Sequence, residues 1–77
     1  MAQYKYGNQL SHVNNDAFDT LHHPGATAPF SGIYKCAGCG IEAVSAHGHS
    51  LPPQNHHQHE PNLGPIRWRL LVASSHR

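Results

Sequence analysis

The residues of this chain best suited to chemistry are two cysteines, Cys36 and Cys39, which are followed directly by Gly40. The sulfurs of a C-x-x-C turn can point at a common centre, and soft thiolates favour zinc. Glycine after the second cysteine lets the backbone reverse through positive φ without a Cβ clash. The amide groups exposed by such a turn can donate hydrogen bonds to the sulfurs. We therefore predict that Cys36 and Cys39 form one half of a tetrahedral zinc site.

The other half must come from different residue types, because the chain has only 2 cysteines but 9 histidines. His56 and His59 follow the cysteines with the spacing C-x2-C-x16-H-x2-H, which is close to the spacing of structural zinc sites. His57 with His59 makes a second usable pair. We expect two of these three histidines to complete a site for one structural Zn²⁺.

Three other interpretations compete for these residues. His47 and His49 are closer to the cysteines in sequence and are alternative ligands. If no histidine completes the site, the thiols are free and the histidine-rich segment is a solvated, metal-scavenging loop. A thiol oxidoreductase shares the cysteine spacing, but Gly40 and Gly48 leave barely a turn and a half of helix between them, and the chain lacks room for a surrounding βαβ unit.

The composition limits the classes of protein. At 77 residues, 38% of them apolar, the chain makes at most one domain with a marginal core, for which bound zinc would supply folding energy. A formal charge of +1 argues against a dedicated nucleic-acid binder. There is no apolar run long enough to span a membrane, and the first residues lack the apolar core of a secretory signal. We expect a cytoplasmic location.

The pattern of the chain predicts three strands around the cysteine turn, over residues 31–36, 41–46 and 66–72. In the third strand, Trp68 is the largest apolar contributor to the core. It should share one face with the other alternating apolar residues, Ile66, Leu70 and Val72. Arg67 and Arg69 then lie on the opposite, solvated face, which is a more economical interpretation than a base-stacking platform.

The remaining segments read as irregular. Residues 1–23 are predicted to be a flexible N-terminal arm with a short helical turn capped by Asn15, in which Phe18 and Leu21 could dock on the domain. The domain itself spans 24–72, with a long loop rich in histidine and proline, and residues 73–77 form a disordered tail.

The segment Tyr34-Lys35-Cys36-Ala37-Gly38-Cys39-Gly40 resembles the first knuckle of a zinc ribbon. Downstream, Leu51-Pro52-Pro53 is similar to the lead into the second knuckle of small bacterial zinc-ribbon proteins, and the framing residues before and after also resemble that family. The chain departs from the pattern at the third and fourth cysteines, where it has Gln54 and His57. Glutamine is a poor zinc ligand, so the resemblance carries a ligand role to His57 but not to Gln54.

The resemblance implies a small β fold: a zinc-ribbon-like hairpin joined by a third strand, with long irregular loops. It implies no enzymatic activity. We expect a zinc-stabilised module that binds an unidentified protein partner. The alternatives are a histidine-rich metal buffer or chaperone and a weak binder of single-stranded nucleic acid.

Overall fold

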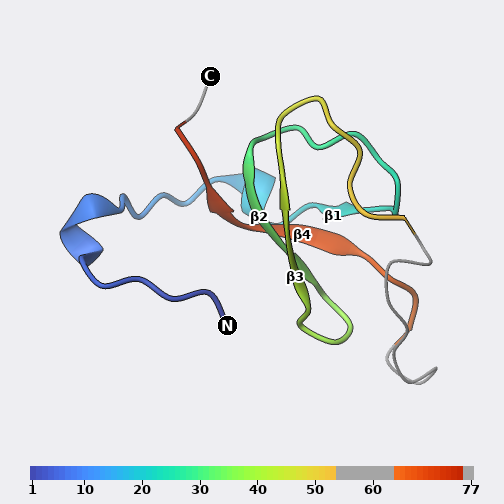
Figure 1. The fold of residues 1–77 in the computed structure, drawn as a ribbon, viewed down its shortest axis with the longest axis horizontal. Helices are drawn as coiled ribbons and strands as arrows, with labels where there is room; N and C mark the ends of the chain where they lie inside the picture. The colour runs from blue at the N-terminus through green and yellow to red at the C-terminus, as the bar shows by residue number, and fades with distance from the viewer. Residues whose placement is uncertain (54–63, 76–77) are drawn as a thin grey trace.

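A computed structural model describes residues 1–53 and 64–75 of the chain and shows a four-stranded antiparallel sheet (Figure 1). The strands stand in the order β1-β4-β2-β3. Their bounds are β1 Leu21–His22, β2 Gly32–Cys36, β3 Glu42–Ser45 and β4 Trp68–Ala73. Two short 3₁₀ helices, η1 (Gly7–Gln9) and η2 (Asp16–Phe18), precede the sheet. The fold is thus a small β domain, as predicted, and the three predicted strands are present with ends that differ by at most two residues.

The last strand in sequence lies inside the sheet. β4 pairs with β1 on one side and with β2 on the other, while β2 also pairs with β3 in a hairpin. Strand β1 was not predicted, because its two residues stand in a polar, histidine-rich stretch. It is held by pairing of Leu21 with Arg69 and of His22 with Trp68. The second half of the N-terminal arm therefore joins the sheet; the mobility of the arm and the boundary at residue 24 stay predictions.

A β-bulge interrupts the pairing of β2 with β4. Ile33 lies opposite Val72, but the next residue, Tyr34, lies opposite Leu70, so Leu71 is an extra residue on β4. Residues directly opposite each other share a face of the sheet, and neighbours in a strand alternate. Val72 therefore shares the face of Ile33, and the prediction that it shares a face with Leu70 is wrong.

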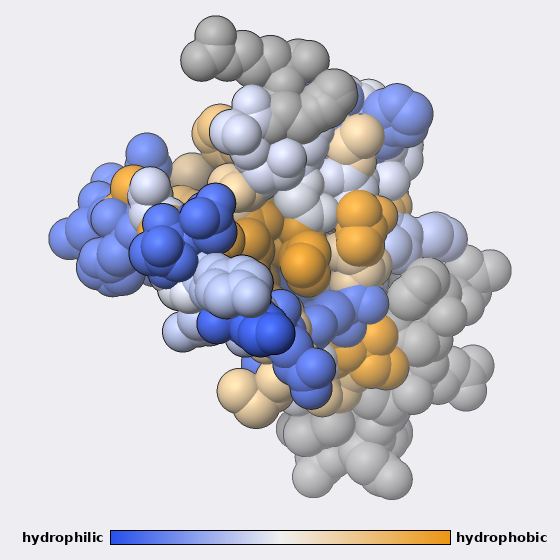
Figure 2. All heavy atoms as spheres, turned by 60° about the vertical axis from the view of Figure 1, so that its left-hand side comes forward, coloured by the Kyte–Doolittle hydropathy of each residue, from blue (hydrophilic) through white to orange (hydrophobic). Residues whose placement is uncertain are grey.

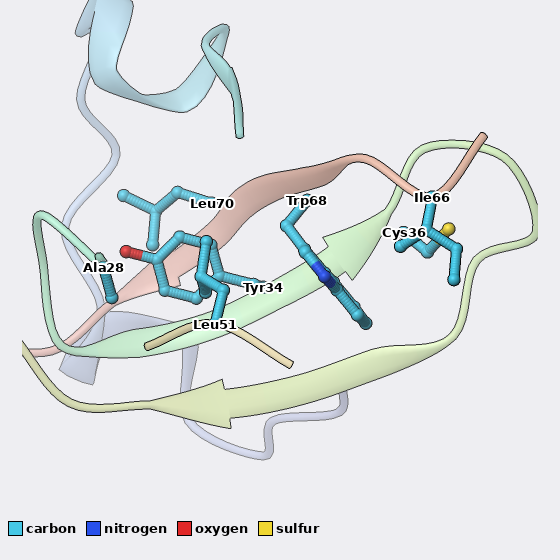
Figure 3. Packing of buried hydrophobic residues seen from close by; sticks show 7 residues of the cluster. All are labelled: Ala28, Tyr34, Cys36, Leu51, Ile66, Trp68 and Leu70. Atoms are coloured by element: carbon cyan, nitrogen blue, oxygen red, sulfur yellow. The ribbon is translucent and has the colours of Figure 1, made fainter. Parts of the chain in front are cut away.

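The core lies on one side of the sheet, which we call the inner face (Figure 3). Its largest side chains are Tyr34 of β2 and Trp68 of β4, both fully buried. The other buried apolar residues of the cluster are Ala28, Cys36, Leu51, Ile66 and Leu70. Burying a large apolar side chain contributes about 1.5–3 kcal/mol, so this cluster supplies most of the hydrophobic stabilisation of the domain.

Two loop segments cover the inner face. A β-bridge joins Thr27 to Ser50, and the Leu51 N–H donates a 2.7 Å hydrogen bond to the carbonyl of Ala26. The segment after Leu51 is fixed to the sheet by the Trp68 Nε1–H, which donates to the carbonyl of Pro52 at 3.2 Å. The indole thus packs in the core and satisfies its one polar group at the same time.

The N-terminal arm contains the predicted cap. The Asn15 side chain accepts a hydrogen bond from the Ala17 N–H at 2.9 Å and begins η2, which is a single 3₁₀ turn rather than the longer predicted one. Phe18 at the end of this turn packs against the core cluster. Further upstream, the Ala2 N–H donates to Glu42 Oε2 at 2.9 Å, which brings the first residues to the sheet. None of the helices in the described ranges is long and apolar enough to cross a membrane.

Candidate metal centre

The two cysteines lie at the tip of the β2–β3 hairpin, on the turn that connects the strands. Cys36 is the last residue of β2, and its N–H donates to the Ile41 carbonyl at 2.7 Å. Its own carbonyl accepts from the Gly40 N–H at 2.9 Å, which closes the turn around Cys39. Gly40 has φ of 86°. The predicted reversal through positive φ is confirmed.

The Cys36 sulfur lies in the interior, with the side chain 1% exposed, whereas Cys39 is half-buried. The sulfur accepts hydrogen bonds from three backbone N–H groups and one side chain, namely the amides of Cys39, Gly38 and Arg67 and the thiol of Cys39. Burial raises the pKa of the Cys36 thiol, but these donors stabilise the thiolate and together hold the pKa below its ordinary value. The predicted support of the sulfur by turn amides is therefore present at Cys36.

Arg67 is a part of the site that the sequence analysis missed. Its N–H reaches the Cys36 sulfur, and its carbonyl accepts a 2.9 Å hydrogen bond from the Ala37 N–H. The cysteine turn is thus clamped by the backbone just before β4. Because both contacts use backbone atoms, the residue type at position 67 does not indicate that this residue supports the cysteine turn.

The two thiols lie close enough for a side-chain hydrogen bond and are not joined by a disulfide. Two sulfurs supported by amide donors are a donor set that suits a soft or borderline metal ion such as zinc. Within residues 1–53 and 64–75, no group of three or more His, Cys, Asp or Glu side chains could hold a metal ion. The described residues therefore bring together two candidate ligands, Cys36 and Cys39.

His47 and His49 are not brought to the thiols. They belong to the turn at the far end of the β2–β3 hairpin from the cysteine turn, as Figure 1 shows. The His47 N–H donates to Ser31 Oγ at 2.8 Å, immediately before β2 begins. The length of β2 separates this turn from Cys36, a distance of about 13 Å at the usual rise of a strand. In this arrangement neither histidine can reach a metal ion that is bound by Cys36 and Cys39.

The other predicted ligands, His56, His57 and His59, and also Gln54, lie outside the described residues. The described chain on either side of them is attached beside the cysteine turn. On one side, the Pro52 carbonyl accepts a hydrogen bond from the indole of Trp68, which lies directly opposite Cys36 in the sheet. On the other, Ile66 is buried close to Cys36 (Figure 3) and precedes the Arg67 amide that bonds the sulfur.

His22 was not singled out from the sequence, although it has an unusual environment. Its ring meets that of Tyr34 edge-on, with 6.1 Å between the centroids. Its Nε2 is buried without a hydrogen-bond partner. Trp68 stands between β1 and β2 on the inner face, so His22 is separated from Cys36 by the indole-bearing strand. We read it as a half-buried side chain packed on Tyr34 rather than as a part of the metal centre.

Comparison with known proteins shows a relative in Escherichia coli. No protein-family model and no solved structure matches the chain. Protein L of Escherichia coli is 47% identical over 67 residues, which cover 84% of this chain and 76% of that protein. Identity of this extent over most of both chains means that they share one fold. The chain therefore belongs to the same family as Protein L of Escherichia coli.

Proposed function

We propose that this protein is a small, non-enzymatic domain of the zinc-ribbon type, stabilised by one zinc ion and used to bind a protein partner. The observation that carries the proposal is the environment of Cys36: a buried sulfur at the end of a strand that accepts hydrogen bonds from three backbone amides. A buried thiol that only packs in a core needs no such donors. Donors of this kind are what a metal-bound thiolate uses.

The proposed ligands are Cys36 and Cys39 with two of His56, His57 and His59. Support for drawing ligands from that segment comes from its flanks, which are both attached next to the cysteine turn. When bound, the ion would cross-link the cysteine turn to this segment and add its binding energy to folding. Four protein ligands leave no open coordination position, so we infer a structural rather than a catalytic ion.

A cytoplasmic location forms part of the proposal. Neither Cys36 nor Cys39 is in a disulfide, and a reducing compartment keeps such thiols available to a metal. A disulfide across two residues would close too short a loop to stabilise the fold.

The test is native mass spectrometry of the purified protein with and without a strong chelator, combined with an amide NMR spectrum of each sample. We expect one zinc ion per chain and loss of spectral dispersion when it is removed. The double variant Cys36→Ser/Cys39→Ser should bind no zinc. The double variant His47→Gln/His49→Gln is the matched control, because these histidines lie at the far end of the hairpin, and it should bind zinc like the parent.

The result that would overturn the proposal is a dispersed spectrum that survives chelation. If several ions then bind weakly through the histidines, the protein is a metal buffer. If no metal binds to a folded protein, the thiols are free and the zinc proposal fails altogether.

A further inference from the structure

The side of the sheet opposite the core, which we call the outer face, carries an unfavourable arrangement of charge. Lys35 of β2 lies directly opposite Arg69 of β4, and on its other side it lies opposite Glu42 of β3. Like charges directly opposite each other in neighbouring strands destabilise a sheet. The Arg69–Lys35 pair therefore costs stability in the isolated domain.

Neither cation is neutralised within residues 1–53 and 64–75. Glu42 is the nearest carboxylate in the sheet, but its Oε2 accepts the Ala2 N–H, and it forms no ion pair with Lys35. Arg69 is exposed and likewise has no ion pair or hydrogen bond from its side chain in the described part of the chain. Glu42 is thus beside Lys35 but is engaged by the N-terminus, and Arg69 has no carboxylate opposite it, so the two cations can receive anionic groups from outside.

A hollow lies beside the two cations. It has a volume of about 290 Å³ and is lined by Lys35 and Arg69, by Leu71 of the bulge, and by the cysteine turn at Ala37 and Gly40. A second hollow of about 270 Å³ continues from it under the first residues of the N-terminal arm. The two share Lys35 and Leu71.

The second hollow is mainly apolar. Its walls include Ile33 and Val72, which face each other across β2 and β4, and Leu10 from the arm, while Glu42 is the one carboxylate in the lining. The bulge is the reason for this character, because it turns both Leu71 and Val72 away from the core. The side of the molecule that carries the arm, which Figure 2 brings forward, shows hydrophobic surface between polar atoms.

We propose that the outer face is the docking surface for a segment of a protein partner in which carboxylate and aliphatic side chains stand next to each other. The carboxylates pair with Lys35 and Arg69, and the aliphatic groups enter the apolar hollow beside Leu71. Charge complementarity selects this occupant, since the unpaired cations require anionic groups and the adjoining walls are aliphatic. The inference rests on the proposed role as an interaction module and names the surface and the partner chemistry.

The chemistry of the hollow favours a peptide over single-stranded nucleic acid. Recognition of single strands combines cations with aromatic rings on which the bases stack. The residues that line the cationic hollow include no aromatic side chain, and the lining of the second hollow includes one, Tyr4 of the arm. Trp68, which alternates with Arg67 and Arg69 in sequence, is fully buried on the inner face and offers no stacking platform.

The test is an NMR titration of the 77-residue protein, in buffer that contains zinc, with three synthetic peptides of equal length. One alternates leucine with glutamate, one has glutamine in place of every glutamate, and one has lysine instead. We expect the acidic peptide alone to saturate, with the largest amide shifts at Lys35, Arg69 and Leu71. Arg69→Glu should weaken binding by about fivefold or more, and Lys35→Gln by about twofold to fivefold, the range expected of exposed ion pairs.

The matched control is Lys5→Glu, which makes the same change of charge at an exposed cation that packs on the Tyr6 ring instead of lining either hollow. It should bind the acidic peptide like the parent protein. Equal binding of the glutamine peptide, or no shift with any peptide, would overturn the proposal. So would stronger shifts at the same residues with inorganic triphosphate or oligodeoxythymidine, which would assign the surface to phosphate. Shifts that depend only on protein concentration would assign it to a second copy of the chain.

These results are independent of the zinc experiment. A failed titration with a protein that binds zinc and unfolds on chelation rejects the docking surface alone. A successful titration with a protein that stays folded without metal rejects the zinc proposal alone.

Discussion

Cys36 and Trp68 lie directly opposite each other in β2 and β4, and both side chains are buried on the inner face of the sheet. The indole also donates to the Pro52 carbonyl, so it contacts the sheet and the segment that leads towards the histidines. A change in the conformation of the cysteine turn should therefore change the environment of Trp68, the single tryptophan of the sequence.

This relationship predicts a fluorescence signal of metal loss. Addition of a chelator should shift Trp68 emission to longer wavelength, because release of the ion opens the core next to the indole and admits water. Re-addition of zinc should restore the original spectrum. The double variant Cys36→Ser/Cys39→Ser should show the shifted spectrum with or without chelator. Trp68 emission that does not change on chelation would show that metal removal does not alter the environment of the indole.

The pH dependence of zinc retention has a definite sign. The pKa of Cys36 is lowered on folding, so the stability contributed by its thiolate is fully present above the unfolded thiol pKa of about 8.5 and is lost as pH falls through the lower folded value. Imidazole ligands add a second loss below about pH 6.5, where they protonate. We expect a zinc-bound, folded protein at neutral pH and a metal-free, unfolded one at strongly acidic pH.

Native mass spectrometry and amide spectra recorded along an acid titration check this sequence. The variant His47→Gln/His49→Gln should give the same midpoint as the parent protein. An amide spectrum that is unchanged in strong acid would contradict the role of histidine ligands.

Gly40→Ala should weaken zinc binding as well as folding. At φ of 86° an alanine is strained, which costs about 1 kcal/mol of unfolding free energy. The added Cβ meets only Lys35 Cε at an ordinary contact of 3.5 Å, so the backbone conformation is the main cause. Gly48→Ala is the matched control, since Gly48 has φ of 85° and open space around it but lies at the far end of the hairpin. Both variants should lose similar stability in urea unfolding, and only Gly40→Ala should lose zinc affinity.

Gly32→Ala should be more damaging than either of these. A Cβ at Gly32 would overlap the backbone carbonyl oxygen of Val72, at the point where β2 passes the bulge of β4. One of the two strands must move to remove this overlap, and overpacking of this kind lowers the free energy of unfolding by about 1–3 kcal/mol. Gly25→Ala, where no atom lies within 4 Å, is the control for strain without overlap. A smaller loss of urea stability for Gly32→Ala than for Gly25→Ala would show that the two strands separate easily.

His22→Phe should stabilise the protein. The buried Nε2 of His22 has no partner, and an unsatisfied buried polar group costs about 1–3 kcal/mol. Phenylalanine keeps the edge-on contact with Tyr34 and removes the polar atom. The neighbouring exposed histidine gives the control His23→Phe, for which the unfolding free energy should change little. A destabilised His22→Phe protein would mean that the nitrogen has a partner in solution.

The sequence predicted those parts of the fold that depend on local pattern. The strands on both sides of Cys36 and Cys39 follow from β-branched and aromatic residues around a turn, and the conformation of Gly40 follows from its position after the second cysteine. The capping role of Asn15 was also predicted from residue type alone.

Features that depend on distant backbone were not predicted. The bulge at Leu71 places Val72 on the outer face, and the apolar run Leu70-Leu71-Val72 does not reveal which residue is the extra one. The Arg67 amide supports Cys36 through an atom that every residue except proline possesses. The two residues of β1 owe their conformation to pairing with β4, and no local propensity marks them. The choice among His56, His57 and His59 stays a prediction, since these residues lie outside the described ranges.

The central position of β4 also affects how the protein is made. A ribosome releases β2, β3 and the two cysteines before it releases β4, yet β4 pairs with both β1 and β2, and the Arg67 amide next to Cys36 lies directly before β4. During synthesis, the two thiols therefore lack these interior neighbours until β4 emerges. Pairing of segments so far apart in sequence is slow relative to local turn formation, so we expect the cysteine turn to form before the interior around Cys36 is complete.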